Sequence, residues 1–187
     1  MTRRLLPVLA VALLTACGTE PPAPEPTAPA PEPIAHYVAL GDSYAAMGSL
    51  SAPTSGPADC LRSADNYPAL VLADPLILAG EDASCSGAVT ADIPTQVAAL
   101  TPDTDLVTLS IGGNDIRFGD IAGCFHRALT EPVDCPALLD APVHHLLSTL
   151  PAELDGVYDT IGALSPGARI IATGYLPLLA DGECPEL

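Results

Sequence analysis

The fold of this chain is decided by the stretch YVALGDSY at residues 37–44, in which a short apolar run leads directly into a glycine turn. The run predicts a buried β-strand, and the turn places Ser43 at the carboxyl end of that strand. A second run, LVTLSI at residues 106–111, leads into the polar turn GGND at residues 112–115. Parallel strands of an open α/β sheet gather their carboxyl ends at one edge, so both turns are predicted to face one ligand crevice.

The two turns offer complementary chemistry. Ser43 supplies a hydroxyl that can attack, and Asn114 supplies a carboxamide NH2 that can hold the resulting oxyanion together with glycine backbone N–H groups. Asp42 and Asp115 are expected to brace the turns through side-chain to backbone hydrogen bonds. Two alternatives stay open: Ser43 can cap the helix that follows, and Asn114 can form its own turn without touching a substrate.

From Ala35 onward, short apolar runs alternate with segments of helical spacing, which predicts a βαβ arrangement with a parallel sheet. Strands are expected at residues 37–40, 76–78, 106–111 and 169–173, the last two covered on both faces. Helices are expected at residues 65–72, from Thr90 through Leu100, and from Pro151 to Leu164. The segment 119–142 has no clear period, so we expect a long loop or irregular insertion bordering the site.

The first 34 residues are predicted to be a targeting segment and a tether. Residues 1–16 combine Arg3 and Arg4 with a short aliphatic stretch and small residues before Cys17, which is the pattern of an export signal. The end of this segment resembles the lipobox of bacterial lipoproteins, which implies that Cys17 carries a lipid anchor in a membrane. An ordinary secretory signal is the alternative. Residues 17–34 alternate proline with alanine, glutamate and threonine, which is typical of a semi-rigid linker.

Residues 35–187 remain as one domain of ordinary size. The formal net charge of the chain is −17, with 6 basic and 23 acidic residues. This balance argues against nucleic acid and against electrostatic docking on anionic lipid. Its simplest meaning is solubility outside the cell. We expect a monomer, and neither a metal nor an organic cofactor is implied.

Five cysteines follow Cys17, and export to an oxidising compartment makes pairing their expected state. Sequence order predicts the disulfides Cys60–Cys85 and Cys124–Cys135, each closing a loop rich in turn residues. No C-x-x-C spacing points to a metal site. Cys184 is left over, so its partner is expected in sequence that this chain lacks.

Three short blocks, taken together, resemble the SGNH (GDSL) hydrolases. GDS at residues 41–43 looks like their first block, SGA at residues 86–88 resembles their glycine block, and GGND at residues 112–115 matches their GxND block. Cys60 and the GY step at residues 174–175 further resemble secreted, disulfide-bearing actinobacterial esterases and lipases. The resemblance extends from about Tyr37 to Cys184.

This resemblance implies a three-layer, flavodoxin-like α/β fold with a parallel sheet. It makes Ser43 the nucleophile, with its own backbone N–H as one oxyanion donor, Gly87 as a second and the Asn114 side chain as a third. Gly87 can also be a plain turn glycine. The implied reaction is hydrolysis of carboxylic esters through an acyl-serine intermediate, and lipid esters and O-acetylated polysaccharides are both plausible substrates.

The sequence does not reveal the general base that would accept the proton of the Ser43 hydroxyl. The family takes it from a histidine in a D-x-x-H block near the carboxyl terminus, and no D-x-x-H occurs here. His36 precedes the first strand, and His126, His144 and His145 lie far upstream of the expected place. We therefore expect a chain truncated before its last strand, helix and histidine block. Two alternatives are a lipid-anchored binding protein or remnant without turnover, and a fold-back that makes His126 or His144 the base.

Overall fold

The computed structural model describes residues 31–175, and all that follows refers to this part of the chain. The signal segment, Cys17, most of the linker and Cys184 lie outside the described residues. The compact unit begins at Glu32, and Ile34, which the sequence assigns to the linker, forms an isolated β-bridge with Ile77.

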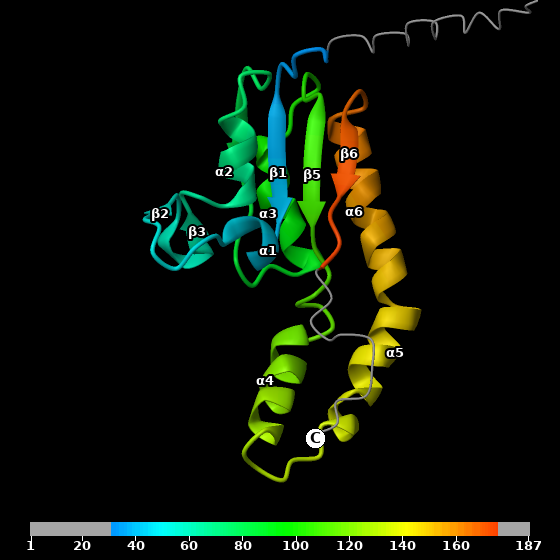
Figure 1. The fold of residues 1–187 in the computed structure, drawn as a ribbon. Helices are drawn as coiled ribbons and strands as arrows, with labels where there is room; N and C mark the ends of the chain where they lie inside the picture. Colours follow the sequence, from blue (N-terminus) through cyan, green and yellow to red (C-terminus); the bar gives the residue numbers. More distant parts are fainter. Residues whose placement is uncertain (1–30, 176–187) are drawn as a thin grey trace, which may run out of the picture. The chain divides into compact units, whose positions relative to one another are not determined.

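The core of the fold is a parallel sheet with the strand order β4-β1-β5-β6, of which Figure 1 labels β1, β5 and β6 side by side. Its strands are β1 (Tyr37–Gly41), β4 (Gly80–Asp82), β5 (Leu106–Ser110) and β6 (Arg169–Ala172). A separate antiparallel pair consists of β2 (Thr54–Ser55) and β3 (Arg62–Ser63). The predicted parallel α/β sheet is confirmed, and β1 and β5 lie side by side at its centre.

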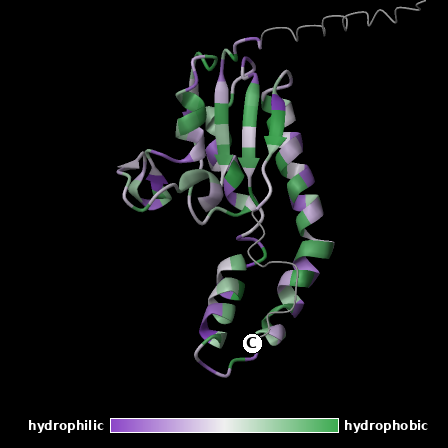
Figure 2. Cartoon of the chain, viewed as in Figure 1, coloured by the Kyte–Doolittle hydropathy of each residue, from purple (hydrophilic) through white to green (hydrophobic). Residues whose placement is uncertain are grey.

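The two central strands are buried along their whole length. Successive side chains of a strand point to opposite faces, so Val38 and Leu40 face one side of the sheet while Tyr37 and Ala39 face the other. The apolar character of β5 is visible as its long green stretch in Figure 2. Burial on both faces is what a parallel strand between two layers of helices requires.

Helices cover both faces of the sheet and so produce three layers. The face with Val38 and Leu40 packs against α3 (Ile93–Gln96) and α6 (Leu150–Leu164). The opposite face packs against α2 (Tyr67–Leu72). The three-layer arrangement expected from the family resemblance is therefore confirmed.

One edge strand lies later in the chain than predicted. A strand was expected at residues 76–78, but β4 spans Gly80–Asp82 and pairs in parallel with β1. The predicted residues do make parallel backbone hydrogen bonds, but only with Ile34, before β1 begins, while the Ile77 side chain packs against the sheet. Gly80 suits the ladder because a Cβ there would lie 2.3 Å from the Tyr37 carbonyl oxygen.

The opposite edge strand, β6, forms where expected, but it is not covered on both faces. Three of its four residues are exposed, and Ile171 is 41% accessible. Among the described residues, β6 pairs with β5 on one side only. Aliphatic character therefore did not distinguish this edge strand from a central one.

The segment predicted as a long loop is mostly helical, so that prediction was wrong. It contains α4 (Phe118–Ala128), a 3₁₀ turn at Pro136–Leu138 and the start of α5 (Asp140–Ser148). Apolar side chains of α4 and of the turn after it stay exposed, as Phe125 and Leu129 do. This partial burial blurs the period by which helices are recognised.

The helix expected from Thr90 to Leu100 is broken into α3 and two flanking 3₁₀ turns, at Thr90–Asp92 and Val97–Ala99. Both predicted disulfides, Cys60–Cys85 and Cys124–Cys135, are present. No helix within residues 31–175 is both long and apolar enough to cross a membrane.

Candidate active site

Ser43 is the first residue of α1 (Ser43–Ala46), which follows β1 directly, and its side chain is half-buried. Asp42 caps this short helix by accepting a hydrogen bond from the Tyr44 N–H at 2.9 Å. The Asp42 N–H donates to the Ser110 carbonyl at 2.8 Å. The turn that carries Ser43 is thus fixed to the carboxyl end of β5.

Only glycine fits at the start of this turn. Gly41 has a φ of +138°, and a Cβ at this position would lie 2.3 Å from the Ser110 carbonyl oxygen. Buried Gln96 holds both backbone groups of Gly41, since its side-chain oxygen accepts from the Gly41 N–H at 2.7 Å and its NH2 donates to the Gly41 carbonyl at 2.9 Å. The last residue of β1 is therefore held from two sides.

Gly87 lies in a turn beside the end of β1. The neighbouring Cys85 N–H donates to the Gly41 carbonyl at 2.9 Å, and the Cys60–Cys85 disulfide anchors the same turn. Gly87 has a φ of +83°, and an added Cβ would meet no atom within 4 Å. The side of Gly87 on which a side chain would stand is thus open space.

The GGND turn is tied to the segment that follows Gly87. The Asn114 NH2 donates to the Ala88 carbonyl at 2.9 Å, which leaves its second hydrogen for another acceptor. Asp115 accepts from the Thr90 N–H at 3.0 Å and from the Thr90 hydroxyl at 2.6 Å. Asp115 was expected to brace its own turn, but it braces this neighbouring segment instead.

Direct hydrogen bonds therefore join all three signature segments at the carboxyl edge of β1 and β5. The Ser43 turn is bonded to the Gly87 turn and to β5, and the Asn114 turn is bonded to the residues after Gly87. Strand register accounts for this meeting, because Gly41 lies opposite Ser110 in the parallel ladder.

Tyr175 is a further residue of this region that local sequence patterns did not identify. Its hydroxyl donates to the Asp42 carboxylate and accepts from the Gly113 N–H at 2.8 Å. Its ring contacts Tyr44 edge-on, with 4.6 Å between ring centroids. Tyr175 thus bridges the GDS and GGND turns. The GY step was noted as part of the family resemblance, but nothing in the sequence indicated which partners it would find.

Burial shapes the electrostatics of this bridge. It raises the pKa of the Asp42 carboxyl, and the hydrogen bonds from Tyr175 and from the Tyr44 N–H offset only part of that increase. Burial and the nearby Asp42 also raise the pKa of the Tyr175 hydroxyl, which therefore stays a donor at neutral pH.

The histidines lie elsewhere. His36 precedes β1, at the end of the strand opposite Ser43, and its Nδ1 lies 2.9 Å from the Thr104 hydroxyl. His145 Nε2 lies 2.9 Å from a Glu153 oxygen, and His126 and His144 are exposed on α4 and α5. All four histidines of the sequence fall within residues 31–175, and there none makes a hydrogen bond to Ser43. The fold-back that would make His126 or His144 the base is not observed.

The chain is similar in sequence to known proteins. The model of the GDSL-like Lipase/Acylhydrolase family matches residues 39–186. The chain is 37% identical over 140 residues to a lipase of Streptomyces rimosus, covering 74% of this chain and 52% of that protein. The chain thus spans about half the length of that lipase.

Two crystal structures are similar as well. The first is phospholipase A1 from Streptomyces albidoflavus, with a TM-score of 0.70, 36% identity, and coverage of 81% of this chain and 64% of that one. The second is an extracellular lipase from Streptomyces rimosus, with a TM-score of 0.67, 33% identity, and coverage of 82% and 66%.

Proposed function

Because the chain belongs to the GDSL-like lipase/acylhydrolase family, we propose that it hydrolyses carboxylic esters through an acyl-serine intermediate on Ser43. One observation carries the proposal. A serine, an open glycine backbone and a side-chain carboxamide, all distant in sequence, are held by direct hydrogen bonds at one edge of the sheet.

In this mechanism the Ser43 hydroxyl attacks the ester carbonyl carbon, and the carbonyl oxygen becomes an oxyanion. The N–H groups of Ser43 and Gly87 and the unused hydrogen of the Asn114 NH2 stabilise that charge. The tetrahedral intermediate then expels the alcohol, and water hydrolyses the acyl-serine. Gln96 and Tyr175 keep the donors in place before the reaction begins, since they bind the turns rather than the substrate.

The proton acceptor is a separate requirement. A serine hydroxyl becomes a good nucleophile only when a base within hydrogen-bonding reach takes its proton. None of the four imidazoles occupies that place in the described structure. The proposed reaction therefore needs an acceptor other than these imidazoles in their present positions.

For substrates, we propose lipid esters first, on the strength of the relatives named as lipases and a phospholipase. O-acetylated polysaccharides remain a second class for the same chemistry.

We also propose that the chain is exported and anchored through Cys17, as its leader pattern indicates. Expression in an actinobacterial host tests the anchor: the wild-type chain should partition with membranes, and Cys17→Ser should move to the soluble fraction. Equal partitioning of both would reject it.

Ester hydrolysis is tested with p-nitrophenyl acetate and longer-chain p-nitrophenyl esters. Ser43→Ala should reduce turnover to the uncatalysed background, whereas Ser148→Ala, which changes an exposed serine at the end of α5, should leave it unchanged. Asn114→Ala should lower kcat by about 10²- to 10³-fold, as loss of one oxyanion donor does in comparable enzymes. Wild-type turnover that survives Ser43→Ala would reject Ser43 as the nucleophile.

A second candidate function is binding of acyl or glycan esters without turnover. The observation in its favour is that no histidine bonds to Ser43 among the described residues. Calorimetric titration with a non-hydrolysable ether analogue of a lipid ester separates the two. Saturable binding by a protein with no Ser43-dependent hydrolysis would favour the binding function.

A further inference from the structure

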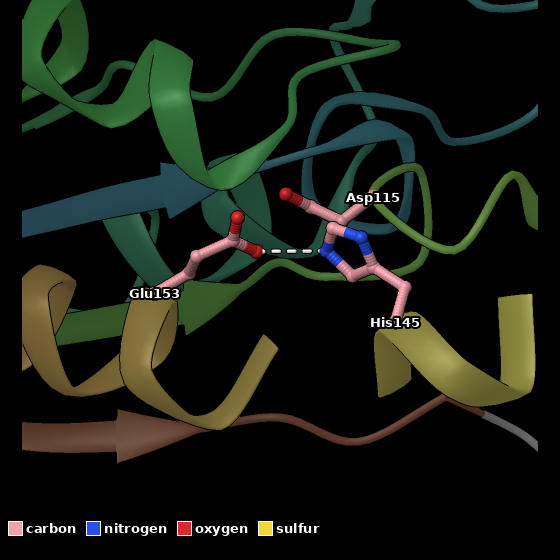
Figure 3. Close-up of side chains that lie close together, drawn as sticks. All are labelled: Asp115, His145 and Glu153. Atoms are coloured by element: carbon pink, nitrogen blue, oxygen red, sulfur yellow. Dashed lines mark hydrogen bonds and ion pairs between the residues drawn. The ribbon is translucent and has the colours of Figure 1, made fainter. Parts of the chain in front are cut away.

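Three metal-ligating side chains from three different elements converge beside the Asn114 turn, and the proposed reaction uses none of them. Asp115 comes from the loop after β5, His145 from α5 and Glu153 from α6, and Figure 3 shows them pointing toward one another. One ligand atom from each lies within 4.8 Å of the other two. All three side chains are half-buried.

The two carboxylates of this cluster have few positively charged partners. Among residues 31–175, neither pairs with arginine, and the chain contains no lysine; the one basic partner is His145, 2.9 Å from Glu153. Asp115 is held in place by Thr90, whose hydroxyl donates to Oδ1 at 2.6 Å and whose N–H is shared between Oδ1 at 3.0 Å and Oδ2 at 3.2 Å. Those bonds orient its carboxylate and leave other lone pairs for an ion.

We propose that Asp115, His145 and Glu153 bind a divalent transition-metal ion, and that Zn²⁺ fits best. Calcium and magnesium prefer all-oxygen sites, whereas an imidazole beside carboxylates suits Zn²⁺. Bonds of roughly 2.0–2.2 Å to a shared Zn²⁺ place ligand atoms about 3–3.5 Å apart. His145 and Glu153 are already close to that spacing at 2.9 Å, and the Asp115 atom, within 4.8 Å of both, would have to move closer.

Space and access are also present. A hollow of about 240 Å³ is lined by Thr90 and Glu153 together with residues of α3 and α6. The hollow opens the Glu153 side of the cluster to solvent, and a water would be the fourth ligand of a tetrahedral Zn²⁺ site.

The position of the site indicates its effect. α5 ends at Ser148 and α6 begins at Leu150, so His145 and Glu153 lie on either side of the corner between these helices. A bound ion would fasten that corner to the loop that carries Asn114. Its role is to hold the Asn114 turn in position, and it does not touch the ester.

The direct test is equilibrium binding of Zn²⁺ to the purified, chelator-treated full chain by calorimetric titration. The wild type should bind one equivalent at this site. His145→Ala and Glu153→Gln should each weaken Zn²⁺ binding by at least about tenfold. Loss of a residue that only supports a metal ligand already weakens binding by about 10- to 100-fold, so loss of a ligand itself should cost no less. The matched controls are His144→Ala and Asp155→Asn, which change an exposed histidine and an exposed carboxylate near the ligands in sequence and should bind as the wild type does.

Two further readouts distinguish this site from binding elsewhere. The absorption spectrum of Co²⁺ bound in place of Zn²⁺ should be that of nitrogen and oxygen ligands, without thiolate charge-transfer bands. The His145→Ala variant should lack this spectrum. Zn²⁺ at about 100 times its Kd should raise the Tm of the wild type by roughly 5 °C or more, but not that of His145→Ala. Absence of Zn²⁺ binding, or equal binding by wild type and His145→Ala, would overturn the proposal whether or not the protein hydrolyses esters.

Discussion

Two glycines of the proposed site have left-handed backbones but opposite surroundings. A Cβ at Gly41 would lie 2.3 Å from the Ser110 carbonyl oxygen, whereas a Cβ at Gly87 would meet nothing within 4 Å. The first glycine is required for packing of the sheet edge. The second leaves open space next to a backbone N–H, which is what an oxyanion donor needs.

These surroundings predict opposite phenotypes for the same substitution. Gly41→Ala should lower the free energy of unfolding by about 2 kcal/mol or more, since backbone strain alone costs roughly 1–3 kcal/mol and the clash adds to it. Gly87→Ala should add only strain but should reduce kcat, because its methyl group enters the space of the proposed oxyanion. Urea unfolding and ester assays on both variants check this. A Gly87→Ala protein with full activity would count against the oxyanion role.

Tyr175→Phe removes the hydroxyl that bridges Asp42 and the Gly113 N–H. We expect it to lower the free energy of unfolding by about 1–3 kcal/mol, as loss of a buried hydrogen-bond partner does, and to lower kcat because the two signature turns separate. Tyr158→Phe, on the exposed side of α6, is the control and should be neutral. Equal behaviour of the two variants would contradict the bridging role.

The raised pKa of Asp42 gives stability a defined pH dependence. Because burial makes the folded state hold this proton more tightly, the stabilising contribution is complete below the unfolded pKa of about 3.9 and is lost as pH rises through the folded value. Asp42→Asn removes the titration. The unfolding free energy of the wild type relative to this variant should therefore grow as pH is lowered from neutral towards about pH 4. Urea unfolding across that range measures it, and a constant or opposite trend would be inconsistent with a raised pKa.

The site residues that the sequence identified are those that lie within a short, recognisable motif. Ser43, Gly87 and Asn114 each lie in a short motif next to an apolar run. Gln96 and Tyr175 hold the same turns, but their partners lie 55 to 133 residues away in sequence. Such pairings depend on strand order and register, which no local pattern contains. The Asp115, His145 and Glu153 cluster was missed for the same reason.

At the scale of elements, prediction succeeded where side-chain burial and backbone pairing coincide. β1 and β5 are central strands, so the apolar runs at residues 37–40 and 106–111 marked their bounds to within about one residue. β4 pairs through a glycine and two acidic residues, and its pairing leaves no apolar signal. Edge strands and partly exposed helices are therefore the elements that composition identifies least well.

The two disulfides are expected to differ in function although they have similar energetic value. Their loops span 25 and 11 residues, so the chain-entropy estimate gives roughly 3 kcal/mol for each. Cys60–Cys85 anchors the Gly87 turn, whereas Cys124–Cys135 ties the middle of α4 to the start of the Pro136–Leu138 turn. Replacing the first pair by serine should lower both Tm and kcat, and replacing the second should lower mainly Tm. Thermal unfolding with ester assays at low temperature separates these effects, and an equal loss of kcat would reject the distinction.

At the scale of the whole molecule, the excess of acidic residues sets the response to salt. The net charge of −17 predicts self-repulsion in the folded state, which added salt screens as the Debye length falls from about 30 Å at 0.01 M to about 8 Å at 0.15 M. The Tm should therefore rise over that range of NaCl concentration. Sucrose at the same osmolality is the control for a general solute effect. A Tm that falls with NaCl would mean that attractive ion pairs outweigh repulsion.

The bridge from Tyr175 to Asp42 also constrains the order in which the protein matures. The β1 to α1 turn is local and can form early, but its link to Gly113 waits for a residue 133 positions further along the chain. Until β6 has docked on β5, the Ser43 turn can have its bonds to Gln96 and Ser110, but it lacks the tie that Tyr175 makes to the Gly113 turn. The link between the two signature turns thus depends on the last strand of the described sheet and is among the later contacts to form.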